Sequence, residues 1–140
     1  MKRSKEALEM FSEGFNCAQA VAAVFAAEAG MDKNNILKAM AGFGGGMGRT
    51  DQVCGAVSGA VMVLGLKYGA GKESKELVYA KVKELTEKFK AKNGSVSCTA
   101  LLGCNMSTKE GLEAAKKKEV HTKVCPKLVS DAVEILEEIL

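Results

Sequence analysis

Hydrophobic residues recur along most of the chain at intervals of three and four positions, the spacing of a helix with one face on a core. In residues 4–12, Ala7, Leu8 and Phe11 fall on one such face. The same spacing predicts helices over residues 17–29, 33–41, 74–92, 108–123 and 127–140, and one or two helical turns within residues 96–107. Because no segment shows the period-two alternation of a strand, the pattern predicts an all-α fold.

Two of the predicted helices differ from the rest. Residues 53–68 are apolar on nearly every side, which indicates a central buried helix. The seven residues GFGGGMG at positions 42–48 precede it and predict a glycine-rich loop. Residues 74–92 form a long amphipathic helix, and its predicted inner face consists of Leu77, Val78, Val82, Leu85 and Phe89.

The chain offers few signals that would end or separate these helices. Pro126 is the single proline, and no change in composition marks a domain boundary. We therefore predict a single compact bundle of five to six helices, one all-α cysteine-motif domain over residues 1–140. Gly55 and Gly59 lie four positions apart in the central helix, so a neighbouring helix can approach closely, and such faces also permit a homodimer.

Composition and charge narrow the classes of function. A net charge of +3, 5% aromatic residues and the absence of Trp give no sign of a nucleic-acid site. The longest uncharged apolar run, about 14 residues, is shorter than the about 20 that cross a bilayer, and the charged N-terminal segment does not resemble a signal peptide. These features predict a cytoplasmic protein without a membrane span. Its five cysteines, an odd number, are then poorly explained by structural disulfides.

Several familiar motifs can be excluded. The glycine-rich stretch fits no G-x-G-x-x-G frame and follows a predicted helix instead of a strand, and Gly71-Lys72 lacks the remainder of a phosphate-binding loop. No C-x-x-C or C-x-x-C-H occurs, so neither a zinc ribbon nor a covalent haem site is indicated. His121 is the only histidine and lies among lysines, which favours a bystander. A cysteine–histidine nucleophilic pair would require this residue.

Four cysteines share a position relative to predicted helices. Cys17 follows Asn16, a good N-cap; Cys54 begins the central helix; Cys98 follows Ser97; and Cys125 precedes Pro126, which favours a first helical turn. Unpaired N–H groups at a helix start lower the pKa of a thiol and stabilise a thiolate. If the four helix starts converge, four thiolates meet in one pocket, and Gly44, Gly45 and Gly46 would let backbone amides approach Cys54.

The residues that carry these features resemble a known family. The segment C-G-A-V-S-G at residues 54–59, with GFGGGMGR before it and GLKYG after it, is similar to the central motif of the redox-active family labelled C_GCAxxG_C_C. Cys17 and Cys125 resemble the first and last cysteines of that family, and Cys98 resembles the remaining one, although Cys104 could exchange with it. The resemblance implies redox activity but neither a substrate nor a reaction. A relative of this domain occurs in split-Soret cytochromes, whose haem motif is missing from this chain.

These observations lead to three hypotheses. In the first, Cys17, Cys54, Cys98 and Cys125 serve a redox partner through thiol–disulfide exchange or hold an iron–sulfur cluster. In the second, the chain is a binding module whose thiolates hold zinc, copper(I) or a small ligand without turnover. In the third, the cysteines only fill space in a helical core.

Overall fold

The computed structural model describes residues 2–140, and within them the fold is all-α, as the hydrophobic periodicity predicts. The first half contains α1 (Lys2–Ser12), α2 (Cys17–Ala23), α3 (Ala26–Ala29), α4 (Lys33–Ala39), α5 (Gly44–Met47) and the central helix α6 (Gly55–Tyr68). A short 3-10 turn η1 (Lys72–Ser74) leads into α7 (Lys75–Asn93). The second half continues with α8 (Cys98–Leu102), α9 (Lys109–Lys117), α10 (Val120–Lys123) and α11 (Cys125–Ile139).

The expected count of five to six helices is too low for residues 2–140, because two predicted helices are each divided and because α5 and α8 are additional short helices. The helix expected over residues 17–29 breaks at Phe25, whose backbone leaves helical geometry (φ −108°, ψ 17°) between α2 and α3. The helix expected over residues 108–123 breaks at Glu119, which adopts a left-handed conformation (φ 56°) between α9 and α10. Each break redirects the chain without a glycine or proline, so hydrophobic spacing gives no sign of it.

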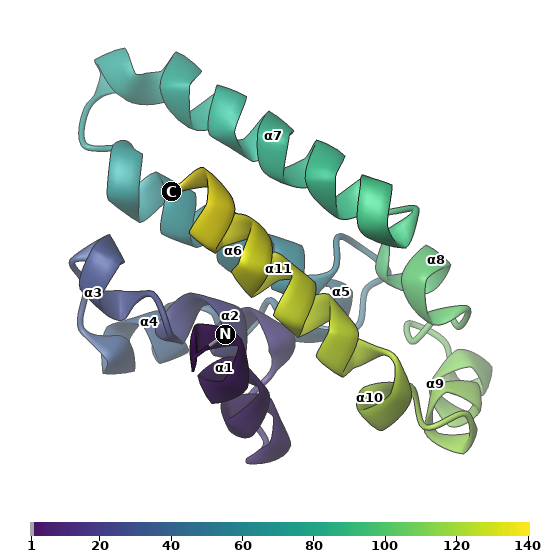
Figure 1. Cartoon of the computed structure of the whole chain (residues 1–140). Coiled ribbons are helices and arrows are strands. Elements are labelled where there is room, and N and C mark those ends of the chain that lie inside the picture. Colours follow the sequence, from purple (N-terminus) through teal and green to yellow (C-terminus); the bar gives the residue numbers. More distant parts are fainter. Residues whose placement is uncertain (1) are drawn as a thin grey trace.

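The helices pack around α6 and α11. Figure 1 shows α11 crossing the molecule between α7 above and α1 below, and α6 runs behind it. The side chains of α11 that face inward include Leu128, Val129, Ile135 and Leu136, all buried. One hydrophobic core extends from Ala7 on α1 to Ile139 on α11 and contains the inner side of α6.

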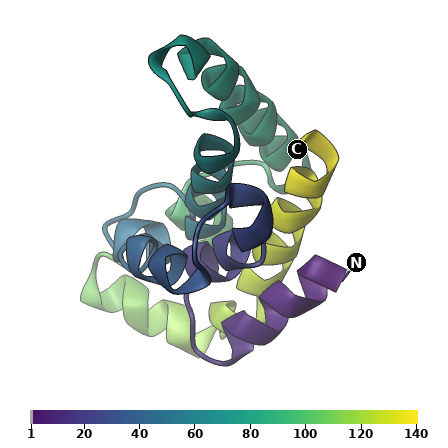
Figure 2. The ribbon, with the colours of Figure 1, turned by 90° about the vertical axis from the view of Figure 1, so that its left-hand side faces the viewer.

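The hairpin of α6 and α7 is less covered than the sequence predicts. Figure 2 shows the end of α6 and the beginning of α7 projecting beyond the other helices. On α7 only Leu85 and Phe89 are buried. Leu77 is 48% exposed, so its predicted inward position is wrong, since no other described element reaches that end of the hairpin.

The glycine-rich stretch is an ordered turn and not an open loop. From Gly45 to Arg49 every residue has a positive φ between 64° and 73°, so this segment, the left-handed turn, coils opposite to an ordinary helix. Backbone bonds from the Gly48 amide to the Gly44 carbonyl (2.8 Å) and from the Arg49 amide to the Gly45 carbonyl (3.0 Å) close it. Three glycines among five residues make this geometry accessible.

None of the helices within residues 2–140 combines the length and the apolar composition needed to cross a membrane.

Candidate functional site

Cys17 is the first residue of α2, and an extensive cap fixes its position. The Asn16 side chain accepts a hydrogen bond from the Gln19 amide (2.8 Å), while the Gln19 side chain accepts one from the Asn16 amide (2.9 Å). The Asn16 side chain also donates to the Ala41 carbonyl (3.1 Å), just beyond α4. This capping box holds the first turn of α2 against the beginning of the glycine-rich stretch.

Cys54 and Cys98 are held together by a short backbone pairing. The Cys54 amide donates to the Val96 carbonyl (2.8 Å), and the Cys98 amide donates to the Gln52 carbonyl (3.0 Å). Val53 and Ser97 thereby form an isolated antiparallel bridge. Cys54 is the N-cap of α6, and Cys98 begins α8 behind its N-cap Ser97. The bridge therefore joins two helix starts that lie far apart in the sequence.

Cys125 completes the set as the first residue of α11, with Pro126 beside it in the first helical turn. The structure thus places Cys17, Cys98 and Cys125 in the first position of a helix and Cys54 at an N-cap, as the sequence predicts. Cys54 and Cys98 are 5% and 6% exposed, whereas Cys17 and Cys125 are partly exposed.

These four cysteines line one cavity of about 420 Å³, which we call the thiol cavity. Its wall also contains aromatic and aliphatic side chains: Phe11, Phe15, Leu101, Leu102, Met106 and Leu128. Cys104 is not part of that wall. Its buried thiol donates instead to the Leu102 carbonyl at 3.7 Å. Of the two cysteines that the sequence left interchangeable, Cys98 is the one that faces the cavity.

Two of the motif glycines lie directly against the sulfur-bearing side chains. A Cβ atom at Gly55 would lie 2.5 Å from Cys17 Sγ and 2.8 Å from the Phe43 carbonyl oxygen. A Cβ atom at Gly46 would lie 2.7 Å from Cys98 Cβ, and the φ of Gly46 is +73°. Real Cβ atoms do not approach other atoms so closely, so any larger residue would displace these cysteines. These two glycines therefore bring backbone close to Cys17 and Cys98.

The electrostatics of the four thiols are strongly unequal. Hydrogen bonding from the Cys54 thiol, the largest influence, together with backbone amides at Gly45 and Ala18, lowers the pKa of Cys17 from 9.0 to about 7, against the opposing effect of burial. The same contact raises the pKa of Cys54 far above its ordinary range. Burial raises the pKa of Cys98 to about 11 and that of Cys125 to about 12, and the negative charge on Cys17 contributes to both shifts. At neutral pH only Cys17 therefore carries a substantial fraction of thiolate.

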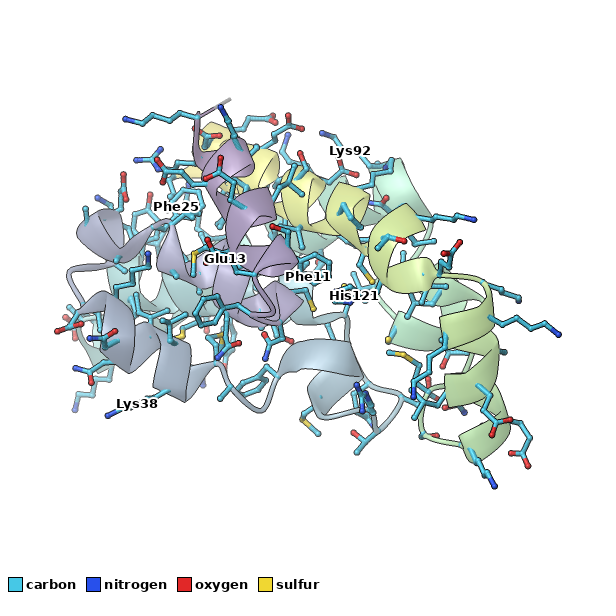
Figure 3. All side chains as sticks on the ribbon, turned by 90° about the horizontal axis from the view of Figure 1, so that it is seen from below. Phe11, Glu13, Phe25, Lys38, Lys92 and His121 are labelled. Carbon is cyan, nitrogen blue, oxygen red and sulfur yellow. The ribbon has the colours of Figure 1, made fainter. Side chains whose placement is uncertain are left out.

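His121 and Arg49 also line the thiol cavity. The His121 ring on α10 stacks on Phe11 of α1, with centroids 4.3 Å apart and planes 27° from parallel; Figure 3 shows the two rings side by side. The sequence favoured a bystander at His121, because its lysine-rich surroundings carry no sign of contact with α1. The break at Glu119, which turns α10 back toward α1, is what brings it to the cavity.

The side chains of the thiol cavity do not form a compact set of metal ligands. Within residues 2–140, no three Cys, His, Asp or Glu side chains are grouped closely enough to bind one metal ion. An iron–sulfur cluster or a structural zinc site requires four such ligands converging on one point. Within the described residues this arrangement therefore does not fit an iron–sulfur cluster or a four-ligand zinc site.

Comparison with known proteins gives one finding. A family model described as "Putative redox-active protein (C_GCAxxG_C_C)" matches residues 15–139, nearly the whole chain. No curated protein and no solved structure matches this chain.

Proposed function

This chain belongs to the C_GCAxxG_C_C family, and from that premise we propose that it is a thiol–disulfide redox protein in which Cys17 is the nucleophile and Cys54 the resolving thiol. The observation that carries the proposal is that both cysteines line one cavity, with Cys17 Sγ against Gly55, the residue that follows Cys54. The pKa of Cys17 is lowered and that of Cys54 is raised by their interaction. In a dithiol whose members differ in this way, the sulfur with the lower pKa is the nucleophilic thiolate, and the other stays protonated until it resolves the mixed disulfide.

The reaction that follows transfers two electrons. The Cys17 thiolate attacks one sulfur of an oxidised substrate, RS–SR, which breaks the S–S bond, forms a Cys17–SR mixed disulfide and releases RS⁻. In the mixed disulfide Cys17 no longer holds the hydrogen bond and the charge that raise the pKa of Cys54. The Cys54 thiol then gives its proton to the released RS⁻ and attacks Cys17 Sγ, which releases the second RS⁻ and forms the Cys17–Cys54 disulfide. The protein dithiol is oxidised, and the substrate disulfide is reduced to two thiols.

The other two cavity cysteines have raised pKa values and stay protonated at neutral pH. We propose that Cys98 and Cys125 form a second dithiol that exchanges with the Cys17–Cys54 disulfide. The negative charge on Cys17 contributes to the raised pKa values of both thiols, which supports the proximity of Cys98 and Cys125 to Cys17. A reducing compartment, which we propose to be the cytoplasm, would return both pairs to the dithiol state.

Mapping the first disulfide that forms tests this assignment. The reduced protein is treated with less than one equivalent of a small disulfide, remaining thiols are alkylated, and the peptides are identified by mass spectrometry. We expect Cys17 linked to Cys54, and the Cys54→Ser variant should accumulate the Cys17 mixed disulfide. A first disulfide that omits Cys17, or unchanged kinetics in Cys17→Ser, would contradict the proposal. Cys104→Ser is the matched control, because Cys104 lies outside the thiol cavity.

The thiol cavity itself supports a second candidate function, a small-ligand-binding module without turnover. Its volume of about 420 Å³ lies within the range typical of small-molecule sites, and its wall is largely apolar. A pure binding module should consume no disulfide, whether or not its cysteines contribute to the binding of its ligand. A redox protein should reduce a small disulfide and lose this reaction in Cys17→Ser.

A further inference from the structure

Apart from the cysteines, the wall of the thiol cavity contains ionisable side chains of one sign only. Apart from its cysteines, only Arg49 and His121 among the lining residues can carry a charge, and in both cases that charge is positive. No Asp, Glu or Lys lines the cavity. A ligand in this cavity therefore meets a permanent cation on the wall, whereas the Asp51 carboxylate, whose charge adds to the effect of burial in raising the pKa of Cys98, lies outside the wall.

The cation is available to a ligand. Among residues 2–140 the Arg49 guanidinium appears in none of the ion pairs, which join other Arg and Lys side chains to Glu and Asp. Arg49 is an exposed residue that ends the left-handed turn, and its side chain lies over Gly45. The nearby Asp51 carboxylate accepts a hydrogen bond from the Thr99 hydroxyl and is not part of the cavity wall.

The remaining wall would suit the hydrocarbon part of a small ligand. The aromatic rings of Phe11 and Phe15 and the side chains of Leu101, Met106 and Leu128 offer apolar contacts. The sulfur of Cys17, the attacking atom, belongs to the cavity wall and lies against Gly55 at the start of α6, so a reacting bond has to enter the cavity to reach it. A disulfide fixed in the surface of a folded protein would not do so readily, whereas a flexible small molecule can.

We propose that the substrate of the thiol cavity is a small, flexible disulfide with carboxylate ends, one of which pairs with Arg49 while the S–S bond lies at Cys17. The inference rests on the proposed function, since it assigns a substrate class to the same cysteines. Arg49 would hold the carboxylate at a point of the wall separate from the Cys17 thiolate, whose negative charge leaves with the departing RS⁻ when the mixed disulfide forms.

Three symmetric disulfides of similar length provide the test: dithiodipropionate, which is anionic, hydroxyethyl disulfide, which is uncharged, and cystamine, which is cationic. Single-turnover oxidation of the reduced protein is followed at low salt, and each rate is divided by that of the same disulfide with a simple uncharged thiol. We expect the normalised rate to fall in the order anionic, uncharged, cationic, with a range of about tenfold, the lower end of electrostatic steering.

Substitutions at Arg49 locate the origin of that order. In Arg49→Gln we expect the three normalised rates to agree within about twofold, whereas Arg49→Lys should preserve the order. Lys38→Gln, on α4 and outside the thiol cavity, is the control for a change of net charge. A wild-type preference for the cationic or uncharged disulfide, or an anionic preference that survives in Arg49→Gln, would overturn the assignment.

A non-reducible ligand separates this inference from the redox function. Octanedioate has the length and end groups of dithiodipropionate but no S–S bond. We expect it to slow alkylation of Cys17 by iodoacetamide in the wild-type protein and to have no effect in Arg49→Gln. If octanedioate protects Cys17 from alkylation but the protein reduces no disulfide, the anion site is supported and the redox function is refuted. Reduction without protection would refute the anion site alone.

Discussion

Replacing Cys54 by Ala tests the physical basis of the proposed chemistry. In the structure the Cys54 thiol is the largest influence that lowers the pKa of Cys17, while burial acts in the opposite direction. Alanine removes the S–H donor but keeps the backbone of the α6 start, including the Cys54 amide bond to the Val96 carbonyl (2.8 Å). The variant therefore isolates the contribution of one hydrogen bond to the Cys17 thiolate.

The size of the effect follows from the pKa values. The shift of Cys17 from 9.0 to about 7 corresponds to about 3 kcal/mol of preference for the thiolate. Removing the Cys54 donor takes away the largest of the lowering influences, so we expect the pKa to rise toward its ordinary value of 9.0. At pH 7 the thiolate fraction then falls about 50-fold, while each thiolate becomes about tenfold more nucleophilic because it is more basic. The net result is about fivefold slower alkylation at pH 7 and faster alkylation above pH 9.

The assay is the pH dependence of iodoacetamide alkylation at Cys17, read by peptide mass spectrometry under reducing conditions. We expect the midpoint to rise by about two pH units in Cys54→Ala, so that the two rate profiles cross. Cys54→Ser should shift less, because its hydroxyl can still donate a hydrogen bond. Cys104→Ala, which removes a thiol outside the thiol cavity, should leave the midpoint unchanged. A midpoint near pH 7 in Cys54→Ala would refute the claim that Cys54 activates Cys17.

Three further outcomes follow from the structure. Gly55→Ala, whose Cβ would lie 2.5 Å from Cys17 Sγ, should lower the free energy of unfolding and change the pKa of Cys17. Gly65→Ala is the control in the same helix, because its Cβ would meet no other atom within contact distance. It should raise the free energy of unfolding, measured by urea titration, by about 1 kcal/mol. Gly59→Ala would place a Cβ 2.5 Å from the Ala18 carbonyl oxygen and force α2 and α6 apart, so the free energy of unfolding should fall by about 1–3 kcal/mol in the same titration. The midpoint of Cys17 alkylation should change less than in Gly55→Ala. The stabilisation due to the lowered pKa of Cys17 is complete above pH 9 and is lost as the pH falls through about 7. The stabilisation due to the raised pKa values of Cys98 and Cys125 is present below pH 9 and is lost as the pH rises through about 11 and 12. The free energy of unfolding of the reduced protein should therefore be highest near pH 9, and Cys17→Ser should lose its rise between pH 7 and 9.

The local sequence around each cysteine was sufficient to predict where it lies on its helix. Asn16 and Ser97 are N-cap residues with side-chain oxygens that satisfy the first amides of α2 and α8, and Pro126 suits the start of α11. These are interactions between residues a few positions apart, so they can be inferred without knowledge of the fold. The small residues of α6 likewise predicted the close approach of a neighbouring helix, and the structure shows that this helix is α2, which contacts Gly59 through Ala18.

The convergence of the cysteines depends on contacts that local sequence does not encode. The pairing of Val53 with Ser97 joins two segments of unremarkable composition, and the redirected backbone at Glu119 brings His121 against Phe11. The left-handed turn was also unpredictable, because Met47 and Arg49 adopt a conformation that their side chains disfavour. Each of these features is held by tertiary packing and long-range hydrogen bonding, and each positions a residue of the thiol cavity wall.

The unequal pKa values explain how four thiols can share one largely apolar wall. Four thiolates in so small a volume would repel one another and lose most of their hydration, which proteins avoid by keeping such groups neutral. Here the amides at the start of α2 and the Cys54 thiol stabilise a single negative charge on Cys17, and that charge helps to keep Cys98 and Cys125 protonated. Oxidation of Cys17 would remove the charge and lower the pKa values of those two thiols. The first disulfide would in this way prepare the second pair to react, so the order of the two exchanges follows from the electrostatics of one cavity.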